Sequence, residues 1–244
     1  MAVQRDWEAE FENRVAWIRN LVESAGVKGI VFGNSGGKDS ALVGILCKAA
    51  CDNTIGIIMP CASKRNYGED AEDDRALAEQ FGIEARVVDL TAVREQELKA
   101  QEGVSQLNDA AVTNIAPRLR MTTLYTIAAA EGRLVAGTGN RSEIYMGYFT
   151  TWGDGASDFN PIADLTATEV FDFLRWLNAP AHIVEKAPSA GLFEGQTDES
   201  EMGVTYRAID TWLQEGTAEE KDLAVIERFH SRSEHKRRPV PTYQ

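Results

Sequence analysis

Apolar residues recur along this chain with two different periods, and the alternation of these periods predicts an α/β fold. Large apolar side chains spaced three and four residues apart predict an amphipathic helix over residues 6–25. The predicted buried face of this helix consists of Trp7, Phe11, Val15, Ile18 and Val22. Further helical patterns cover residues 39–50, 68–81, 112–131, 167–177, 206–213 and 219–230.

Short apolar runs rich in β-branched residues lie between the earlier helical segments. They predict strands buried on both faces, at residues 29–32, 54–59, 84–88 and 133–136. The alternation predicts a doubly wound parallel β-sheet with helices on both faces, a Rossmann-like arrangement. No repeat or linker is visible, so residues 1–244 are expected to form a single domain. Segment 101–114 is polar, and segment 188–200 is glycine-rich, acidic and without periodicity. Both are either lids over a ligand or plain surface loops.

The turn after the first predicted strand carries the clearest candidate chemistry. It reads Ser35-Gly36-Gly37-Lys38-Asp39-Ser40 and joins a strand to a helix, a layout that surrounds an anion with backbone N–H groups. Gly36 and Gly37 are expected to adopt positive φ and to let the backbone approach a phosphate. Asp39 is placed to hold Mg²⁺ beside that phosphate. The plain alternative is a glycine turn that binds nothing.

The spacing of this turn excludes two commoner phosphate loops. A Walker A loop requires a glycine and a serine or threonine at the places where this chain has Phe32 and Asp39. A dinucleotide-binding G-x-G-x-x-G through Gly33 and Gly36 would require a glycine in place of Val31. The turn instead resembles the PP-loop of ATP pyrophosphatases, which cleave ATP between its α and β phosphates.

Charge and composition narrow the range of partners. The net charge of −13 argues against a nucleic acid, whose phosphates would be repelled by most of the surface. No apolar run is long enough to cross a membrane, and no signal peptide is visible. The three cysteines are too few for a disulfide framework, which favours a cytoplasmic location. The basic run at residues 235–238 is either a solvated tail or a phosphate-binding segment.

A second constellation follows the fourth predicted strand and identifies a family. It reads Gly137-Thr138-Gly139-Asn140-Arg141-Ser142-Glu143, then Gly147-Tyr148-Phe149-Thr150, Gly153-Asp154-Gly155 and Asp158. Together with the PP-loop, this pattern resembles the ammonia-dependent NAD synthetases. Further matches, in the same order along essentially the whole chain, are Asn114, Arg118-x-Arg120-Met121, Pro161-Ile162, Pro188-Ser189-Ala190-Gly191-Leu192, Gly195-Gln196-Thr197-Asp198-Glu199 and His235-Lys236-Arg237. The resemblance implies the fold of the adenine nucleotide alpha-hydrolases.

The resemblance also implies an activity. The family joins ammonia to the nicotinic acid carboxylate of deamido-NAD, with ATP as co-substrate. The carboxylate attacks the α-phosphate to give an acyl adenylate and pyrophosphate, and ammonia then displaces AMP to give NAD. Glutamine-dependent members carry an extra amidase domain, for which these residues have no room, so free ammonia or a separate partner would supply the nitrogen. The family is homodimeric, with the deamido-NAD site formed across the interface.

Individual roles follow from the same resemblance. The expected triphosphate ligands are Gly33, Asn34, Ser35, Gly36, Gly37, Lys38, Asp39 and Ser40. Thr138 and Ser189 are expected to contact ATP, and the expected deamido-NAD ligands are Arg118, Asp158, His235 and Lys236. Asp39, Glu143 and Ser35 are the expected catalytic residues, and the two carboxylates among them would hold Mg²⁺. Each residue taken singly also has a structural interpretation, such as helix capping for Glu143.

This sequence departs from the family pattern at two positions. The family usually has a lysine after Gly-Tyr-Phe-Thr, where this chain has Thr151, and a lysine in Leu-x-Lys, where this chain has Ala167. A charge-assisted hydrogen bond to a phosphate contributes about 1.5–3 kcal/mol, so we expect two such losses to have consequences.

Three explanations of these departures stay open. Lys38, Lys64, Arg65 or Arg141 could supply the missing charge from another position. Alternatively, the chain could be a ligase that amidates a different carboxylate, or a dinucleotide-binding relative with little turnover. A tRNA-thiolating PP-loop enzyme is disfavoured, because the chain lacks a C-x-x-C pair and a basic face.

Overall fold

The computed structural model describes residues 5–61, 79–185 and 197–243. Its sheet consists of four parallel strands in the order β3-β2-β1-β4. The strands are β1 (Gly29–Asn34), β2 (Thr54–Ile58), β3 (Glu84–Val87) and β4 (Arg133–Ala136). They lie where the sequence predicts strands, and their parallel pairing confirms the predicted fold class. The chain steps outward from β1 to β3 and then returns to the other side of β1 to form β4.

Helices surround this sheet in the part of the chain that the structure describes. In chain order they are α1 (Trp7–Ala25), α2 (Lys38–Ala50), α4 (Thr91–Ala100), α5 (Asp109–Thr113), α6 (Ile115–Glu131), α7 (Arg141–Met146), α8 (Ala167–Trp176), α9 (Ala181–Glu185), α10 (Asp198–Met202), α11 (Tyr206–Glu215), α12 (Glu220–Arg232) and α13 (Glu234–Arg237). None of them is long and apolar enough to cross a membrane.

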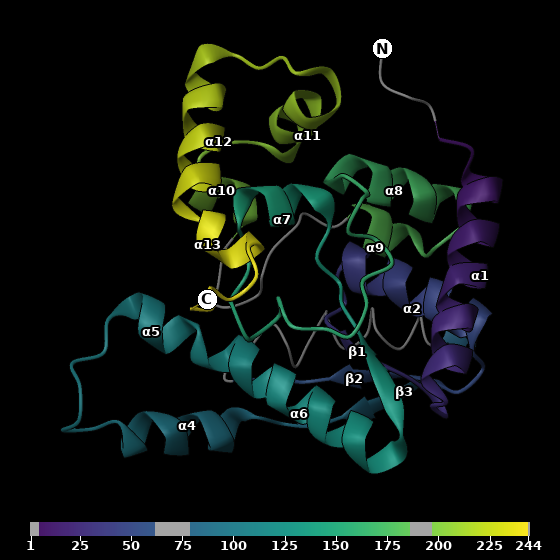
Figure 1. The fold of residues 1–244 in the computed structure, drawn as a ribbon, viewed down its shortest axis with the longest axis horizontal. Helices are drawn as coiled ribbons and strands as arrows, with labels where there is room; N and C mark the ends of the chain where they lie inside the picture. The colour runs from purple at the N-terminus through teal and green to yellow at the C-terminus, as the bar shows by residue number, and fades with distance from the viewer. Residues whose placement is uncertain (1–4, 62–78, 186–196, 244) are drawn as a thin grey trace.

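Three apolar clusters hold these layers together. One cluster joins α1, α2 and α8 to one face of the sheet, and a second joins α6 to the opposite face (Figure 1). A third cluster lies outside the sheet and packs α7, α10, α11 and α12 together. The two faces match the predicted double winding, while the third cluster forms a helical lobe above the carboxyl edge of the sheet.

Local signals in the sequence explain where the longest helices begin and end. Asp6 caps α1 by accepting a hydrogen bond from the backbone N–H of Ala9, and Gly26 ends this helix at φ +64°. Gly132 ends α6 in the same left-handed conformation, with φ +69°. Side chains other than glycine adopt this conformation at a cost, so these glycines fix the helix ends.

Two sequence predictions about local structure need correction. The strand β3 is predicted to be buried on both faces, but it lies at the edge of the sheet and its residues are mostly exposed. Segment 101–114 is predicted to be a lid or a surface loop, but it contains the short helix α5. The predicted helix at 68–81 and the candidate lid at 188–200 fall mainly outside the described residues.

Candidate functional site

The PP-loop and the loop after β4 leave the sheet side by side. Phe32 of β1 pairs with Ala136 of β4, so the segments beyond these residues open into the same crevice. The strand order reverses at this point, because β2 and β3 lie on one side of β1 and β4 lies on the other. Crevices at such reversals, beyond the carboxyl ends of the strands, are the usual ligand sites of open α/β sheets. Both motifs therefore lie at the place where an open α/β sheet usually binds its ligand.

The PP-loop is held in shape by its two serines. Ser40 Oγ donates to the carbonyl of Gly37 at 2.9 Å and lies 3.1 Å from Ser35 Oγ. The backbone N–H of Gly37 donates to Ser35 Oγ at 3.4 Å. These bonds lie within the loop, so the serines shape the phosphate cradle before any ligand arrives.

The two glycines of the loop have different conformations. Gly36 has φ +70°, as predicted, but Gly37 has φ −93° and forms the extended N-cap of α2. The predicted positive φ at Gly37 is therefore wrong. A Cβ at Gly37 would lie 3.3 Å from Ser35 Oγ, so close packing against Ser35 favours glycine there.

Asp39 and Glu143 are brought together by Asn140. The side-chain amide of Asn140 donates to Asp39 Oδ1 at 3.0 Å. Asn140 is also the N-cap of α7, in a capping box in which Glu143 Oε2 accepts from the Asn140 backbone N–H at 3.0 Å. One residue thus links the carboxylate after β1 to the carboxylate after β4. Burial and the charge of Asp39 raise the pKa of Glu143 well above its usual value, which indicates strained electrostatics between the two acids.

Lys38 lies beside these carboxylates and is only 4% exposed. Its ammonium donates to Asp39 Oδ2 at 2.5 Å, and it sits 5.5 Å from the ring centroid of Phe171 and 5.6 Å from that of Tyr206. Burial alone would lower the pKa of Lys38, but the charges of Asp39 and Glu143 outweigh burial and raise it. Lys38 is therefore a cation in this site.

Two further buried acids surround this region. Asp198 is 3% exposed and accepts from the hydroxyl of Tyr206 at 3.0 Å. Asp210 accepts from Ser142 Oγ and from the backbone N–H of Thr168 at the start of α8. The acids in and around the crevice therefore outnumber Lys38, and the surplus negative charge favours a bound cation.

The chemistry of these donors fits Mg²⁺. Mg²⁺ prefers oxygen ligands, retains several waters, and is typically held by one or two carboxylates together with substrate phosphates. Asp39 and Glu143 provide two carboxylates next to the phosphate cradle. Among the described residues, no group of three or more His, Cys, Asp or Glu side chains is placed to hold a metal ion.

A cavity of about 1150 Å³ opens above the two loops. Its walls come from the PP-loop, α5 and α6, the segment 136–163, and α12 with α13. Predicted site residues that line it are Gly33, Asn34, Ser35, Gly37, Lys38, Asp39, Ser40, Thr138, Glu143 and Lys236. This volume suits a nucleotide-sized ligand.

Other predicted residues lie elsewhere. Arg118 is exposed on α6, and His235 is exposed on α13. Asp158 accepts from the backbone N–H of Val135 at 2.8 Å and from the hydroxyl of Tyr125 at 3.3 Å. Gly36 is buried, and Ser189 lies outside the described residues. The cavity lining includes neither Gly36 nor any of the three charged residues Arg118, Asp158 and His235.

Lys236 fixes the wall of the cavity. Its ammonium donates to the carbonyls of Gly147 at 2.8 Å and Phe149 at 2.6 Å, and lies 5.3 Å from the Phe149 ring centroid. The neighbouring Arg237 donates to the carbonyls of Tyr145 and His230. The helix α13 thereby holds the segment after α7 in place.

The two positions that lack the family lysine differ in exposure. Ala167 is fully buried at the start of α8, whereas Thr151 is partly exposed beside the cavity wall. Among the residues suggested as substitutes, Lys64 and Arg65 lie outside the described residues. Arg141 donates to the carbonyl of Leu213 at 3.1 Å, so its guanidinium faces α11. Lys38 is the described candidate that faces the site.

Sequence reasoning missed several residues that build the site. The family motif alone assigns no role to Asn140, although the pattern Asn-x-x-Glu predicts a capping box. Arg120 lines the cavity, and its Nε donates to the carbonyl of Met59 at 3.2 Å. The contacts of Asp198 and Asp210 depend on tertiary packing, for which a single sequence carries no local signal.

Comparisons with known proteins agree with this geometry. A family model described as NAD synthase matches residues 10–240. The NH(3)-dependent NAD(+) synthetase of Carboxydothermus hydrogenoformans is 46% identical over 242 residues, which cover 96% of each chain.

Two solved structures show the same likeness. NMN synthetase from Francisella tularensis superposes with a TM-score of 0.92 at 36% identity, over 98% of this chain and 99% of that chain. The NH3-dependent NAD synthetase of Campylobacter jejuni, solved with a nitrate ion, superposes with a TM-score of 0.81 at 28% identity. The superposition covers 99% of this chain and 100% of that chain. The predicted family is thereby confirmed, and this chain belongs to the NAD synthase family.

Proposed function

We propose that this chain catalyses the ATP-dependent amidation of deamido-NAD by ammonia, giving NAD, AMP and pyrophosphate. The observation that carries this proposal is the meeting of the PP-loop with Asp39 and Glu143 in one crevice, linked through Asn140. A phosphate cradle and two carboxylates are the parts that an adenylating ligase requires. The curated relatives named NH(3)-dependent NAD(+) synthetase support the same activity.

The chemistry proceeds in two displacements. A carboxylate oxygen of the nicotinic acid group attacks the α-phosphorus of ATP, and the bond from that phosphorus to the pyrophosphate oxygen breaks. The nitrogen of ammonia then attacks the acyl carbon, the bond to AMP breaks, and the nitrogen releases a proton. The first step brings anions together, so a preorganised cradle of donors and cations is the main requirement.

The chain's residues divide this work. Backbone N–H groups of the PP-loop and the cation Lys38 bind the phosphates, while Ser35 and Ser40 keep the loop in shape. Thr138 and Ser189 are proposed ATP contacts. Asp39 and Glu143 would hold Mg²⁺, which supplies charge neutralisation at the triphosphate when it is bound.

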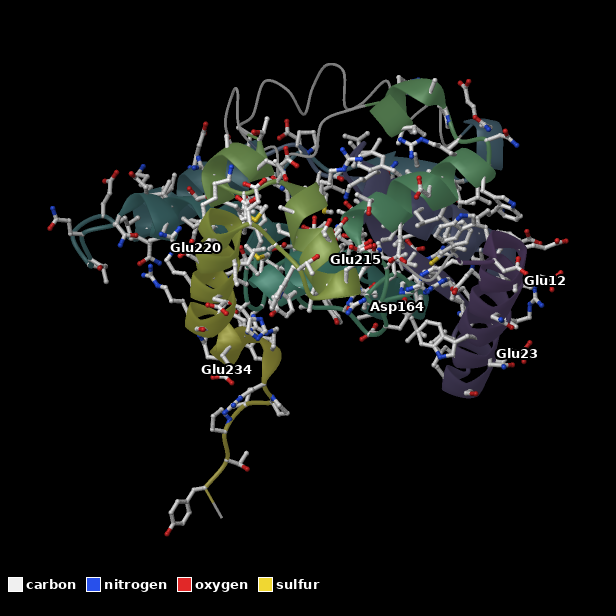
Figure 2. The ribbon with its side chains drawn as sticks, turned by 90° about the horizontal axis from the view of Figure 1, so that it is seen from above. Glu12, Glu23, Asp164, Glu215, Glu220 and Glu234 are labelled. Atoms are coloured by element: carbon white, nitrogen blue, oxygen red, sulfur yellow. The ribbon has the colours of Figure 1, made fainter. Side chains whose placement is uncertain are left out.

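The outer surface is acidic, whereas part of the cavity wall is basic. Figure 2 shows Glu12 and Glu23 of α1, Glu215 of α11 and Glu220 of α12 on the outside of the molecule. In contrast, the cavity lining contains Arg228, Arg232, Lys236 and Arg237 from α12 and α13. This contrast supports a small anionic substrate over a nucleic acid, whose extended backbone would meet the acidic exterior.

We also propose that the chain acts as a cytoplasmic homodimer in which residues 1–244 form one ligase unit. Arg118, Asp158 and His235 do not line the cavity of a single chain, which supports a deamido-NAD site completed by a second copy. All three cysteines are unpaired, in keeping with a reducing compartment. Sedimentation that finds only a 26.9 kDa species at micromolar concentration would contradict the dimer.

The activity is tested by following nucleotides in the presence of ATP, Mg²⁺ and ammonium. The expected result is formation of NAD, AMP and pyrophosphate in equal amounts, dependent on both deamido-NAD and ammonium. Chromatography separates these products from ADP, which an ordinary kinase or ATPase would release. Folded, ATP-binding protein that forms no NAD would overturn the proposal.

A second candidate substrate is nicotinic acid mononucleotide, whose amidation would give NMN. The TM-score of 0.92 with the NMN synthetase of Francisella tularensis exceeds the 0.81 found for the NAD synthetase of Campylobacter jejuni. Thr151 also stands where the family usually has a lysine. The two substrates are distinguished by measuring kcat/KM for each under identical conditions. A difference of more than about tenfold between the two kcat/KM values, equal to about 1.4 kcal/mol, would show which of the two substrates the enzyme prefers.

A further inference from the structure

The short helix α7 lies among α8, α11 and α12, and it carries Glu143 in its first turn (Figure 1). A helix of six residues is too short to be stable by itself in water, so the position of α7 depends on its tertiary contacts. Asn140, at its start, bonds to Asp39 across the crevice. A second set of bonds holds the same turn, and it comes from residues that do not line the cavity.

Asp210 of α11 is the centre of this second set and is only 2% exposed. Its Oδ1 accepts from the hydroxyl of Ser142, and its Oδ2 accepts from the backbone N–H of Thr168 at 2.8 Å. Ser142 Oγ in turn accepts from the backbone N–H of Ala167 at 3.1 Å. The first N–H groups of α8 have no partner within the helix, so Asp210 and Ser142 satisfy two of them. The dipole of α8 also favours a carboxylate at this end.

Ser142 is fully buried, and Glu143 follows it directly in α7. Successive side chains of a helix point roughly 100° apart, so Ser142 can face α8 and α11 while Glu143 lines the cavity. The preceding residue, Arg141, adds two bonds to the same neighbours. Its backbone N–H donates to the carbonyl of Leu165 at 2.7 Å, and its guanidinium donates to that of Leu213 at 3.1 Å. The turn that carries Glu143 is thus held from the side of α8 and α11.

We propose that Asp210 is a positioning residue for Glu143. Asp210 fixes the first turn of α7 through Ser142 and the first turn of α8 through Thr168. The Glu143 carboxylate therefore stays beside Asp39, where the two acids can share a metal ion. Residues that orient a metal ligand contribute to affinity although they never touch the metal. This inference rests on the proposed use of both acids as Mg²⁺ ligands, but it does not depend on which carboxylate is amidated.

The test compares four variants with the original chain. Asp210→Asn keeps the shape of the side chain but places an NH₂ group against one of its two donors. Ser142→Ala removes the hydroxyl that joins Asp210 to α7, and the double variant combines both changes. Thr166→Ala is the matched control, because it removes another bond at the start of α8, the one from the Glu169 N–H. The Thr166 hydroxyl otherwise bonds within α8 and to Gln214 of α11.

Calorimetry of ATP binding over a range of Mg²⁺ concentrations gives the concentration at which the gain in ATP affinity is half complete. Asp210→Asn and Ser142→Ala are each expected to raise this concentration about tenfold, as is usual when the support of a metal ligand is removed. The double variant should exceed the larger single effect by less than about twofold, because both changes break one link. Thr166→Ala should stay within about twofold of the original chain.

Amide hydrogen exchange of residues 141–146 is a second readout, and it requires neither ATP nor metal. Asp210→Asn is expected to speed this exchange at least about fivefold relative to Thr166→Ala, because α7 opens more easily when a tertiary contact is lost. Equal exchange in the two variants would contradict the positioning role.

An unchanged Mg²⁺ requirement in Asp210→Asn would overturn the proposal, and so would an equal rise in Thr166→Ala. Additive effects in the double variant would show that Asp210 does not act through Ser142, which also overturns it. If Asp210→Asn fails to fold, Ser142→Ala decides the matter, since it removes a single hydroxyl. ATP binding that ignores Mg²⁺ in the original chain would contradict the proposed metal site, and Mg²⁺-dependent binding without NAD or NMN formation would contradict amidation alone.

Discussion

Two of the charged clusters among the described residues differ in their charge balance. The first joins α1 to α8 and the turn before it. Arg5 and Arg14 pair with Glu10, Asp164 and Glu169 at distances of 2.7–3.1 Å. The second lies at the crevice, where Lys38 stands near the four carboxylates Asp39, Glu143, Asp198 and Asp210.

The difference indicates what each cluster is for. In the first cluster two arginines face three carboxylates, and each of the five side chains has an ion-pair partner, so the α1–α8 cluster acts as a structural contact. In the crevice, burial and neighbouring acids raise the pKa of Glu143, which costs folding free energy unless a ligand compensates. A surplus of buried charge of one sign is typical of a ligand-binding site, whereas a cluster in which every charge has an ion-pair partner is typical of a contact between elements.

The largest expected effect is loss of activity in Asp39→Asn. The change removes a charge beside the phosphate cradle, so we expect kcat/KM for amidation to fall roughly 100- to 1000-fold, equal to about 2.7–4 kcal/mol. Steady-state NAD formation measures this fall. Asp164→Asn is the matched control in the α1–α8 cluster, and it should change kcat/KM less than twofold. Similar losses in both variants would contradict the distinction between the clusters.

Arg14→Met should have the opposite profile, with lower stability and unchanged catalysis. Arg14 donates to the carbonyl of Pro161 and to two carboxylates, and its side chain is 12% exposed. We expect the free energy of unfolding in urea to fall by about 2–4 kcal/mol. Arg19→Met on the same helix is the control, since Arg19 is exposed and its bond to Ala49 is 3.5 Å long. A loss in Arg14→Met no larger than the control would refute the structural role.

Two capping boxes sharpen the comparison. Asn140 caps α7 inside the site, and Thr166 caps α8, with Glu143 and Glu169 as their respective partners. Asn140→Ala and Thr166→Ala should each cost about 1 kcal/mol of stability. Only Asn140→Ala removes the hydrogen bond from the Asn140 amide to Asp39. The kcat of Asn140→Ala should therefore fall about tenfold, while the kcat of Thr166→Ala stays within threefold of the original value. Parallel denaturant and rate measurements on both variants check this, and equal rates would contradict it.

The smallest expected effect is on acid stability. Burial raises the pKa of Asp164, but its hydrogen bond to Arg14 and the charges of Arg14 and Arg5 outweigh burial and lower it. The pKa of Asp164 in the folded state is thus below its unfolded value of about 3.9. The ionised carboxylate therefore stabilises the fold above pH 3.9, and this stabilisation is lost as the pH falls through the folded-state pKa. Between pH 5 and 3, Asp164→Asn should lose less stability than the original chain, by under about 1 kcal/mol because the carboxylate is half exposed. Identical pH profiles would exclude this contribution.

Much of the fold follows from local patterns in the sequence. The four strands, α1, α2 and α6 were predicted within a few residues, because the strands are short apolar runs and the helices carry a clear period. The helices α1 and α6 also end at a glycine. The prediction for β3 was wrong in its burial, because an edge position depends on the order of strands rather than on the strand itself. The helix α7 was missed because its six residues are too few for a period to appear.

The site was predictable as a set of residues but not as a set of contacts. The PP-loop and Glu143 were found from motifs, yet the hydrogen bond from Asn140 to Asp39 joins residues 101 positions apart. The placement of Lys38 over Phe171 and Tyr206 requires α8 to pack on α2 and α11 to pack on α8. Gly37 was predicted to have positive φ, but a glycine can also be required by a close side chain, here Ser35.

The bonds from α13 to the segment after α7 bear on how the enzyme is made. Lys236 and Arg237 hold the carbonyls of Tyr145, Gly147 and Phe149, which belong to the cavity wall. These two residues leave the ribosome long after the PP-loop and β4 have emerged. A nascent chain can therefore form its sheet early, yet it cannot complete the wall until residue 237 is available. Proteolytic removal of the residues after Ser233 would likewise remove the bonds to Gly147 and Phe149, while the bond from Ser233 to the carbonyl of Met146 would stay.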